Sequence, residues 1–488
     1  MSRTSRRWVV FAAILLAVTL ATAPWTAAAS AAKTDKLLVI GWDGVPSGYP
    51  FEFVPPTQLP MLGWMLENGV VAEKGLLPVV PSNTTPSWAS ILTGAFPGTH
   101  SLTNNSYHYV TTPITVGAYG DVRQLEAETL PVVAEKHGLA TATLGGVFLS
   151  WPAADSGLTG PVMGWGNYYA KPKVVSNYEI EGAALAPYLW LDYERVELFP
   201  VSDLPASVQT YSPAYAFSLT IPTYNGPVAA WLFIATDTVN DGQVAYDTVV
   251  ILESDESELS YFSESDQASR TQPVAVLREG EWAALPLRLD GRRIGLYVKL
   301  IDLTEDLQKV RVYATALRGP QVEPAWLEKE VSEYVSIPVG PDRNALIGGF
   351  VDEQTFAEEV ILGLNWSAEM YSYIIARTKP DVAFVYFTET DEWMHRMYGY
   401  LDETSPWYDE AKVAERRALF ATVFEAADRA SWRVWQAMGG PEESTAVLVS
   451  DHGFASTWKI ANVNERLAQL GLYNPTDPAS SKAMAYSA

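Results

Sequence analysis

The sequence predicts an α/β fold in which a mostly parallel sheet is flanked by helices and interrupted by an antiparallel β insertion. Short apolar runs alternate with helical segments in the first and last parts of the chain. From about residue 198 to residue 318 the pattern changes to alternating segments separated by Gly, Asp and Pro. A length of 488 residues suits one large α/β domain with such an insertion, or two to three ordinary domains.

The first 32 residues are typical of an export signal. Three arginines among the first seven residues precede an apolar stretch from about Trp8 to Leu20, and small residues suited to cleavage follow near Ala32. The paired arginines are similar to a twin-arginine signal, but Val9 stands where that motif prefers Phe, so the route stays open. An uncleaved membrane anchor is the alternative. We expect a protein that is periplasmic, extracellular or at the cell surface, with no transmembrane helix in its mature part.

Composition limits the chemistry. The chain has no cysteine, which excludes disulfides and thiolate metal sites and leaves carboxylate, imidazole and hydroxyl groups as ligands. Its net charge of −24 makes binding of a nucleic-acid polymer unexpected, whereas acidic pockets for divalent cations are easy to accommodate. A solvated acidic surface is the commoner cause of such a charge. Nothing in the sequence indicates the oligomeric state.

Residues 33–197 are expected to form the first part of a catalytic α/β domain. The run "KLLVIGWDG" predicts a buried parallel strand from Leu37 to Ile40 that ends near Asp43. Helical segments ("QLPMLGWMLENG", "EAETLPVVAEKHG") and a further apolar run ("ATATLGGV") follow it, as in βαβ units.

Residues 198–320 are expected to form the insertion, with strands such as "YAFSLTIP", "DTVVILES", "RIGLYVKLIDL" and "KVRVYATALR". A cluster of edge hairpins and a small sandwich fit this pattern equally well. Residues 321–488 return to the α/β pattern, with helices near Gln354 to Arg377 and Tyr408 to Met438 and around "VNERLAQLG". The strands "DVAFVYFTET" and "TAVLVSDHG" lie between these helices, and we expect this last part to be incomplete.

Three of these strands, far apart in the sequence, are each followed by an aspartate. Asp43 follows "LLVIGW", Asp391 follows "VAFVYFTET", and Asp451 follows "AVLVS". The carboxyl ends of parallel strands line one crevice, so the three acids should converge there. Any one of them alone could equally form a turn or cap a helix. Together with two well-placed histidines, they predict a metal site.

The histidines stand beside two of these acids. Asp391 and His395 are four residues apart, so both side chains lie on one face if a helical turn follows the strand. Asp451 and His452 are adjacent, and a strand tip can direct both at one ion. Each histidine taken alone could instead be a core histidine with a hydrogen bond.

A threonine stands before a predicted helix in "PVVPSNTTPSWASILTGAFPGTHSLTNN". Pro86 fits the first turn of that helix, so Thr84 should lie at its N-terminus, where free N–H groups favour phosphate. Metal coordination would lower the pKa of the hydroxyl and make it a nucleophile. Thr84 or Thr85 acting simply as an N-cap is the alternative.

Taken together, "GWDG", "NTTPSWASILTGAFPGTHSLTNN", "TDEWMH" and "VSDHG" resemble, in order, the motifs of the alkaline phosphatase superfamily, specifically its type I phosphodiesterase and nucleotide pyrophosphatase branch. The similarity runs from about Lys36 to the end of the chain, with the antiparallel segment as a lineage-specific insertion. The resemblance implies the fold of that superfamily and a hydrolase acting on a small phosphoric ester, either a diester or a monoester. A phosphotransferase or mutase is the related alternative.

The resemblance also implies a site for two divalent metal ions, zinc in most phosphodiesterases and manganese in the mutases. It implies that Thr84 is the nucleophile, that a phosphothreonine forms and is then hydrolysed, and that Asn105 helps to hold a phosphoryl oxygen. His100 is expected to be structural. Asp43, Thr84, Asp451 and His452 match the ligands of one metal, and Asp391 and His395 match two of the three protein ligands of the other.

One ligand of the second metal has no match. Family members supply a further histidine from beyond the "DHG" motif, and this chain has none after His452. Either the sequence is a fragment, which we favour, or the second metal is weakly held, or His108 or another residue substitutes. A catalytically impaired member that acts as a binding protein is therefore an alternative to the enzyme.

Overall fold

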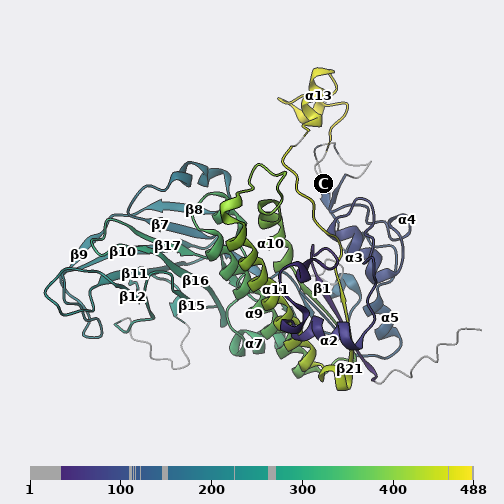
Figure 1. Ribbon diagram of the computed structural model, residues 1–488, viewed down its shortest axis with the longest axis horizontal. Helices are drawn as coiled ribbons and strands as arrows, with labels where there is room; N and C mark the ends of the chain where they lie inside the picture. Colours follow the sequence, from purple (N-terminus) through teal and green to yellow (C-terminus); the bar gives the residue numbers. More distant parts are fainter. Residues whose placement is uncertain are drawn as a thin grey trace, which may run out of the picture.

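The computed structural model describes residues 34–108, 113, 115, 117–120, 122–145, 152–224, 226–261, 271–459 and 461–485. The expected export signal in residues 1–32 lies outside the described residues. Figure 1 shows two parts side by side: an α/β part built around β1, and a β part that contains strands β9 to β12. The expected fold class, α/β with an antiparallel insertion, is confirmed.

The central sheet has six strands in the order β19-β5-β4-β20-β1-β21. β1 is parallel to both of its neighbours, β20 and β21, and β4 continues the parallel arrangement beside β20. β5 is parallel to β4, and β19 closes this edge in the antiparallel direction. The bounds are β1 Lys36–Trp42, β4 Thr141–Leu144, β5 Val162–Met163, β19 Val322–Glu323, β20 Val382–Phe387 and β21 Ser444–Val449.

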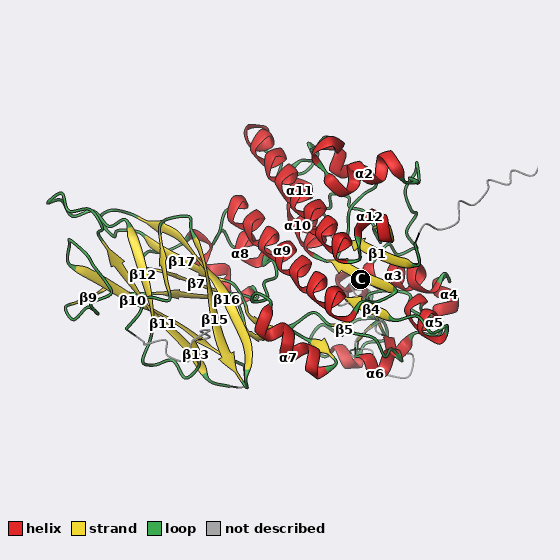
Figure 2. Ribbon diagram, turned by 90° about the horizontal axis from the view of Figure 1, so that it is seen from below, coloured by secondary structure: helices red, strands yellow, loops and turns green. Residues whose placement is uncertain are grey.

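Alternate side chains of β1 enter two different cores. Leu38 and Ile40 are fully buried in the large core that also contains side chains of α2 (Pro60–Asn68), α9 (Glu353–Thr378) and α11 (Val413–Ala437). Leu37 and Val39 point the other way, toward α3 (Thr84–Thr93) and α5 (Leu130–Lys136). Helices therefore cover both faces, with α9 and α11 on one side and α3 and α5 on the other (Figure 2).

The insertion is a β-sandwich. A five-stranded sheet (β14-β12-β11-β10-β9) and an eight-stranded sheet share one apolar core, in which Phe217 and Trp231 from the first meet Leu296 and Val312 from the second. Strands of the five-stranded sheet are β9 Phe199–Val201, β10 Ala214–Pro222, β11 Val228–Thr236, β12 Thr248–Glu253 and β14 Ala275–Leu277.

The eight-stranded sheet begins earlier in the chain than residue 198. Its path is β13-β15-β16-β17-β7-β8, and β18 bridges β16 and β6. Strands β6, β7 and β8 precede residue 198, and they are too short to show a long alternating pattern in the sequence. Its bounds are β6 Asn167–Ala170, β7 Lys173–Ser176, β8 Asp192–Arg195, β13 Ser260–Tyr261, β15 Trp282–Leu289, β16 Arg292–Leu303, β17 Val310–Ala314 and β18 Leu317–Gly319.

The sandwich is anchored to α9 by polar contacts. The Tyr313 hydroxyl donates to Glu359 over 2.9 Å, and Lys299 Nζ lies 2.6 Å from a Glu358 oxygen. These contacts hold the eight-stranded sheet against the α/β part, so residues of the insertion line a cavity together with residues of the central sheet.

The remaining elements are short. In Figure 1, α13 stands away from the rest of the α/β part. Among the described residues, no helix is both long enough and apolar enough to cross a membrane. The bounds of these short helices and strands are β2 Ser106–Tyr107, β3 Ala118–Tyr119, α4 Pro97–His100, α6 Ala153–Ser156, α7 Ala325–Tyr334, α8 Arg343–Ile347, α10 Glu389–Met397, α12 Gly440–Glu443 and α13 Val463–Gln469.

Candidate active site

The three predicted aspartates lie at the carboxyl end of the central sheet. Asp43 follows β1 directly, Asp451 follows β21, and Asp391 lies in the first turn of α10, just after β20. They come together because β20, β1 and β21 are neighbours and run in the same direction. Within the described residues, the ligand atoms of Asp43, Asp451 and His452 all lie within 4.8 Å of one another.

The imidazole of His452 is at the centre of the first group. Its Nε2 lies 3.4 Å from Asp43 Oδ1, 3.7 Å from Asp451 Oδ2 and 3.3 Å from Thr84 Oγ1. His452 Nδ1 lies 3.1 Å from the Gly453 carbonyl oxygen and can only donate to it, which leaves the lone pair on Nε2. The four predicted ligands of one metal are thus brought together.

Hydrogen bonds from neighbouring residues fix these side chains. Asp451 Oδ1 accepts from the Gly44 amide over 3.2 Å, and the Thr390 hydroxyl donates to the Asp43 carbonyl oxygen over 2.7 Å. The buried Tyr386 hydroxyl donates to Asp43 Oδ2. Asp43 therefore presents its other oxygen, Oδ1, to His452.

Asp391 and His395 form the second predicted pair. Both belong to α10, one turn apart, and His395 Nε2 lies 3.2 Å from Asp391 Oδ2. The interpretation that they share a helix face is confirmed. Phe454 packs against both histidine rings, with centroids 4.9 Å from His395 and 5.8 Å from His452. The pair is more open than the first group, because the His395 side chain is 47% exposed.

Unpartnered oxygens indicate that these groups suit a cation. Asp43 Oδ1, Asp391 Oδ1 and Asp451 Oδ2 are buried and have no hydrogen-bond partner among the described residues. Burial, together with the charges of Asp451 and Asp391, raises the pKa of the Asp43 carboxyl well above its ordinary value. Burial also raises the pKa of Asp451. Each of the three carboxyls thus has one buried oxygen without a donor, and a divalent cation would stabilise such a group of neighbouring acids.

Thr84 is the first residue of α3, so Pro86 lies in the first turn as predicted. Asn105 Oδ1 accepts from the Thr85 amide over 2.8 Å. That bond fixes the orientation of the Asn105 amide and leaves its Nδ2 as a donor. Thr84, Asn105, Asp43 and Asp391 all line one cavity of about 390 Å³, a volume suited to a small ligand.

The two other notable histidines lie away from this group. His100 is fully buried; its Nδ1 accepts from the Leu102 amide and its Nε2 lies 3.0 Å from Ser90 Oγ, which agrees with a structural role. His108 Nε2 lies 3.0 Å from the Pro113 carbonyl oxygen. His108 does not belong to the metal-binding group found among the described residues.

Several residues in or beside the site carried no sequence signal. Tyr386 stands inside the apolar run "VAFVYF" and looks like a core residue, and Glu389 precedes Asp391 on α10. Arg318 comes from β18 of the sandwich and reaches the same cavity. Only the position of Tyr386, five residues before Asp391 on the strand leading to it, could have drawn attention to it.

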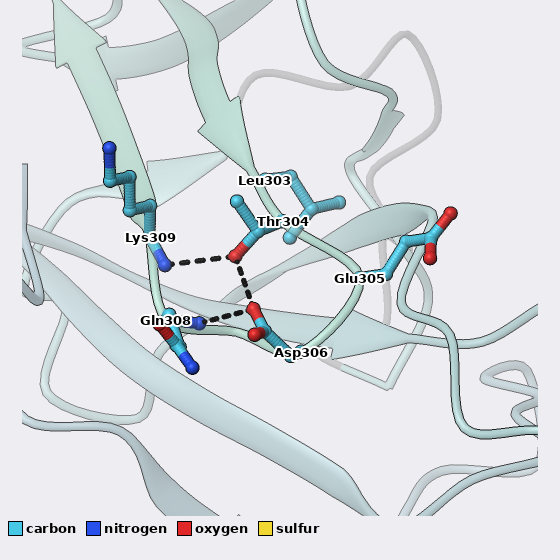
Figure 3. A pocket seen from close by; sticks show the side chains of 6 residues that line it. All are labelled: Leu303, Thr304, Glu305, Asp306, Gln308 and Lys309. Atoms are coloured by element: carbon cyan, nitrogen blue, oxygen red, sulfur yellow. Dashed lines mark hydrogen bonds between the residues drawn. The ribbon is translucent and has the colours of Figure 1, made fainter.

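A second hollow lies at the turn between β16 and β17 and is formed by residues 303–309 (Figure 3). Its polar groups bond to one another: Thr304 Oγ1 donates to Asp306 Oδ1 over 2.8 Å, and the Gln308 and Lys309 amides donate into the same turn. This network accounts for the turn, and no catalytic grouping is present there.

Comparison with known proteins identifies the family of this chain. The family model described as type I phosphodiesterase / nucleotide pyrophosphatase matches residues 37–486. A comparison with curated proteins gives no match. The family match spans both parts of the α/β domain and all seven predicted site residues, and it confirms the resemblance seen in the motifs. This chain belongs to the type I phosphodiesterase/nucleotide pyrophosphatase family of phosphoric ester hydrolases.

Proposed function

We propose that this protein is an exported, metal-dependent hydrolase of small phosphoric esters, with Thr84 as its nucleophile. The observation that carries the proposal is the position of Thr84 Oγ1. It lies at the N-terminus of α3 and 3.3 Å from His452 Nε2, beside two buried carboxylates with unpartnered oxygens.

The donor set fits two divalent cations, zinc or manganese. Asp43, Asp451 and His452 with Thr84 would hold one, and Asp391 with His395 would hold the other. When bound, such cations supply Lewis acidity, which lowers the pKa of a coordinated hydroxyl and neutralises charge on a phosphoryl group.

The residues of the chain then have distinct tasks. Thr84 Oγ1 loses its proton to solvent and forms a bond to phosphorus while the bond to the leaving oxygen breaks. Asn105 Nδ2 donates to a phosphoryl oxygen, and the N-terminus of α3 favours the same negative charge. Water then hydrolyses the phosphothreonine and restores the hydroxyl group.

The test is turnover of p-nitrophenyl phosphate and bis(p-nitrophenyl) phosphate by the purified protein with zinc or manganese. Thr84→Ala should lower kcat at least about a thousandfold, because the nucleophile is gone. Thr93→Ala is the matched control at the other end of α3; its hydroxyl bonds only to nearby backbone, and activity should persist. Equal rates for Thr84→Ala and the parent protein would exclude this mechanism.

A phosphate-binding protein without turnover is the second candidate. It is favoured by the second pair, which is more open and would offer a metal only two side-chain ligands, Asp391 and His395, within the part of the chain that the structure describes. Metal-dependent binding of inorganic phosphate without hydrolysis of either ester would support this candidate over the enzyme.

A further inference from the structure

The catalytic cavity contains a buried cation that the proposed reaction does not use. Arg318 lies in β18 of the sandwich, pairs with Tyr168 of β6, and is only 5% exposed. Its side chain lines the cavity together with Thr84 and Asp43. The insertion thus contributes a guanidinium group to the cavity in which we expect the phosphoryl group to bind.

The guanidinium group is held firmly in place. Nη2 donates to the Trp165 carbonyl oxygen, and Cζ lies 4.4 Å from the centroid of the Tyr168 ring. A Cβ atom on Gly340 would lie only 2.0 Å from Nη1, so the absence of a side chain there makes room for the group. These contacts fix the orientation of Arg318 before any ligand binds.

Among the described residues, no carboxylate forms an ion pair or hydrogen bond with Arg318, although Glu359 and Glu389 lie near enough to interact with its charge. Nε is buried without a hydrogen-bond partner among the described residues. The nearby Glu389 is also buried, and it accepts from the Ser367 hydroxyl over 2.6 Å instead. A buried guanidinium group with an unpartnered N–H is stabilised when a ligand supplies a negatively charged oxygen to accept from it.

Arg416 shows how the same protein neutralises a comparable arginine. It is 4% exposed, and its Cζ also lies 4.4 Å from a tyrosine ring, that of Tyr400. Arg416 differs in donating from Nε and Nη2 to Glu353, over 3.0 and 2.8 Å. Arg318 has the same burial and the same aromatic support but lacks the carboxylate.

We propose that Arg318 binds a second anionic group of the substrate, a carboxylate or a phosphate, beyond the phosphoryl group that Thr84 attacks. This inference rests on the proposed function, which locates the phosphoryl group. Arginine suits the task because its planar fork can donate two parallel hydrogen bonds to either kind of oxyanion. The volume of about 390 Å³ limits the substrate to a compact molecule with two anionic ends.

Binding to the zinc-loaded protein tests the subsite without requiring turnover. The probes are benzylphosphonate, 4-carboxybenzylphosphonate and p-xylylenediphosphonate, compared by calorimetry. The probes with a second anion should bind about ten- to a hundredfold more tightly than benzylphosphonate. Comparing the dissociation constants of 4-carboxybenzylphosphonate and p-xylylenediphosphonate then shows whether the subsite prefers a carboxylate or a phosphonate.

Variants of the subsite should remove that preference. Arg318→Met should bring the ratio of dissociation constants close to one while benzylphosphonate binds as before. Gly340→Ala provides a second variant, because the added methyl group displaces Nη1 while the charge remains. Arg416→Met is the matched control, since it removes a buried arginine outside the cavity and should leave the ratio unchanged.

Turnover gives a parallel readout. The parent protein should hydrolyse 4-carboxyphenyl phosphate with a higher kcat/KM than phenyl phosphate, and both subsite variants should abolish the difference. Equal binding of singly and doubly anionic probes by the parent protein, or a preference that survives in the subsite variants, overturns the proposal. If the phosphonates show the Arg318-dependent preference but no ester is hydrolysed, the subsite stands and the proposed hydrolase function fails.

Discussion

Thr84 Oγ1 lies 3.3 Å from His452 Nε2, although 368 positions of sequence separate the two residues. Thr84 opens a helix on one face of the central sheet, and His452 follows the strand at the edge of that sheet. They meet because β21 pairs with β1, which ends just before Asp43, whose Oδ1 is 3.4 Å from the same nitrogen. The proposed nucleophile and metal ligands are therefore positioned by the most regular part of the fold.

Tyr386→Phe should weaken metal binding. The Tyr386 hydroxyl donates to Asp43 Oδ2, and its loss leaves that buried oxygen without a donor and free to rotate away from the site. Removal of such a supporting hydrogen bond typically lowers metal affinity about ten- to a hundredfold. Titration of the metal-free protein with zinc against a chelating dye measures the change.

Tyr313→Phe is the control for that experiment. Tyr313 is likewise fully buried and donates to a carboxylate, Glu359, over 2.9 Å, but on the sandwich side of α9. Both variants should lose about 1–3 kcal/mol of stability through an unsatisfied acceptor. Only Tyr386→Phe should alter zinc affinity, and equal zinc affinities in the two variants would contradict the role assigned to Tyr386.

Gly44→Ala should damage the metal site by displacing Asp391. Gly44 has φ +68°, and an added Cβ would lie 2.4 Å from the Phe454 ring and 2.8 Å from Asp391 Oδ1. Gly48 has a similar φ of +77° with open space around it. Gly48→Ala should therefore show only the backbone strain of about 1–2 kcal/mol. Thermal unfolding and zinc titration of both variants separate strain from displacement, and an unchanged zinc affinity in Gly44→Ala would count against this view.

Local patterns predicted four strands of the central sheet, β1, β4, β20 and β21, but not the two-residue strands β5 and β19. The apolar runs before Asp43, Asp391 and Asp451 are long enough to identify buried strands, and the parallel order then brings the acids together. The four-residue spacing of Asp391 and His395 similarly fixed their common helix face. These relationships depend on periodicity, which a single sequence displays directly.

Other features depend on tertiary contacts and have no local signature. Strands β6, β7 and β8 are too short to show alternation, so the start of the eight-stranded sheet was not apparent. Arg318 belongs to a strand of three residues, and its position in the cavity that Thr84 also lines follows from the contact between the sandwich and α9. Tyr386 has the sequence surroundings of a core strand residue, and its hydrogen bond to the Asp43 carboxyl can be recognised only in the structure.

The two proposed cations should bind with different affinities. The first group offers Asp43, Asp451 and His452 in a buried setting, whereas His395 of the second pair is 47% exposed. Equilibrium dialysis with zinc should show one tightly bound ion and a second that dissociates more readily. His452→Ala should abolish the tight site, and His395→Ala should remove only the weak one. Loss of the tight ion in His395→Ala would reverse this assignment.

Asp428 should make stability depend on pH. It lies on α11 and accepts from the Met61 and Leu62 amides of α2, and burial raises its pKa from 3.8 to about 6. Between these values the folded protein carries a proton that the unfolded chain lacks. The free energy of unfolding therefore falls as pH rises through that window, by about 3 kcal/mol in total, and ionisation of this group causes no further change above about pH 6.

Asp428→Asn removes the titrating group and should remove that slope. Urea unfolding midpoints of the metal-free proteins, from about pH 4.5 to about pH 7.5, provide the comparison. The parent protein should lose stability relative to Asp428→Asn as pH rises toward 6, since ionisation of the buried carboxyl is penalised only in the folded state. Use of metal-free protein keeps metal release from contributing to the slope. A constant difference between the two proteins across this range would show that Asp428 ionises equally in both states.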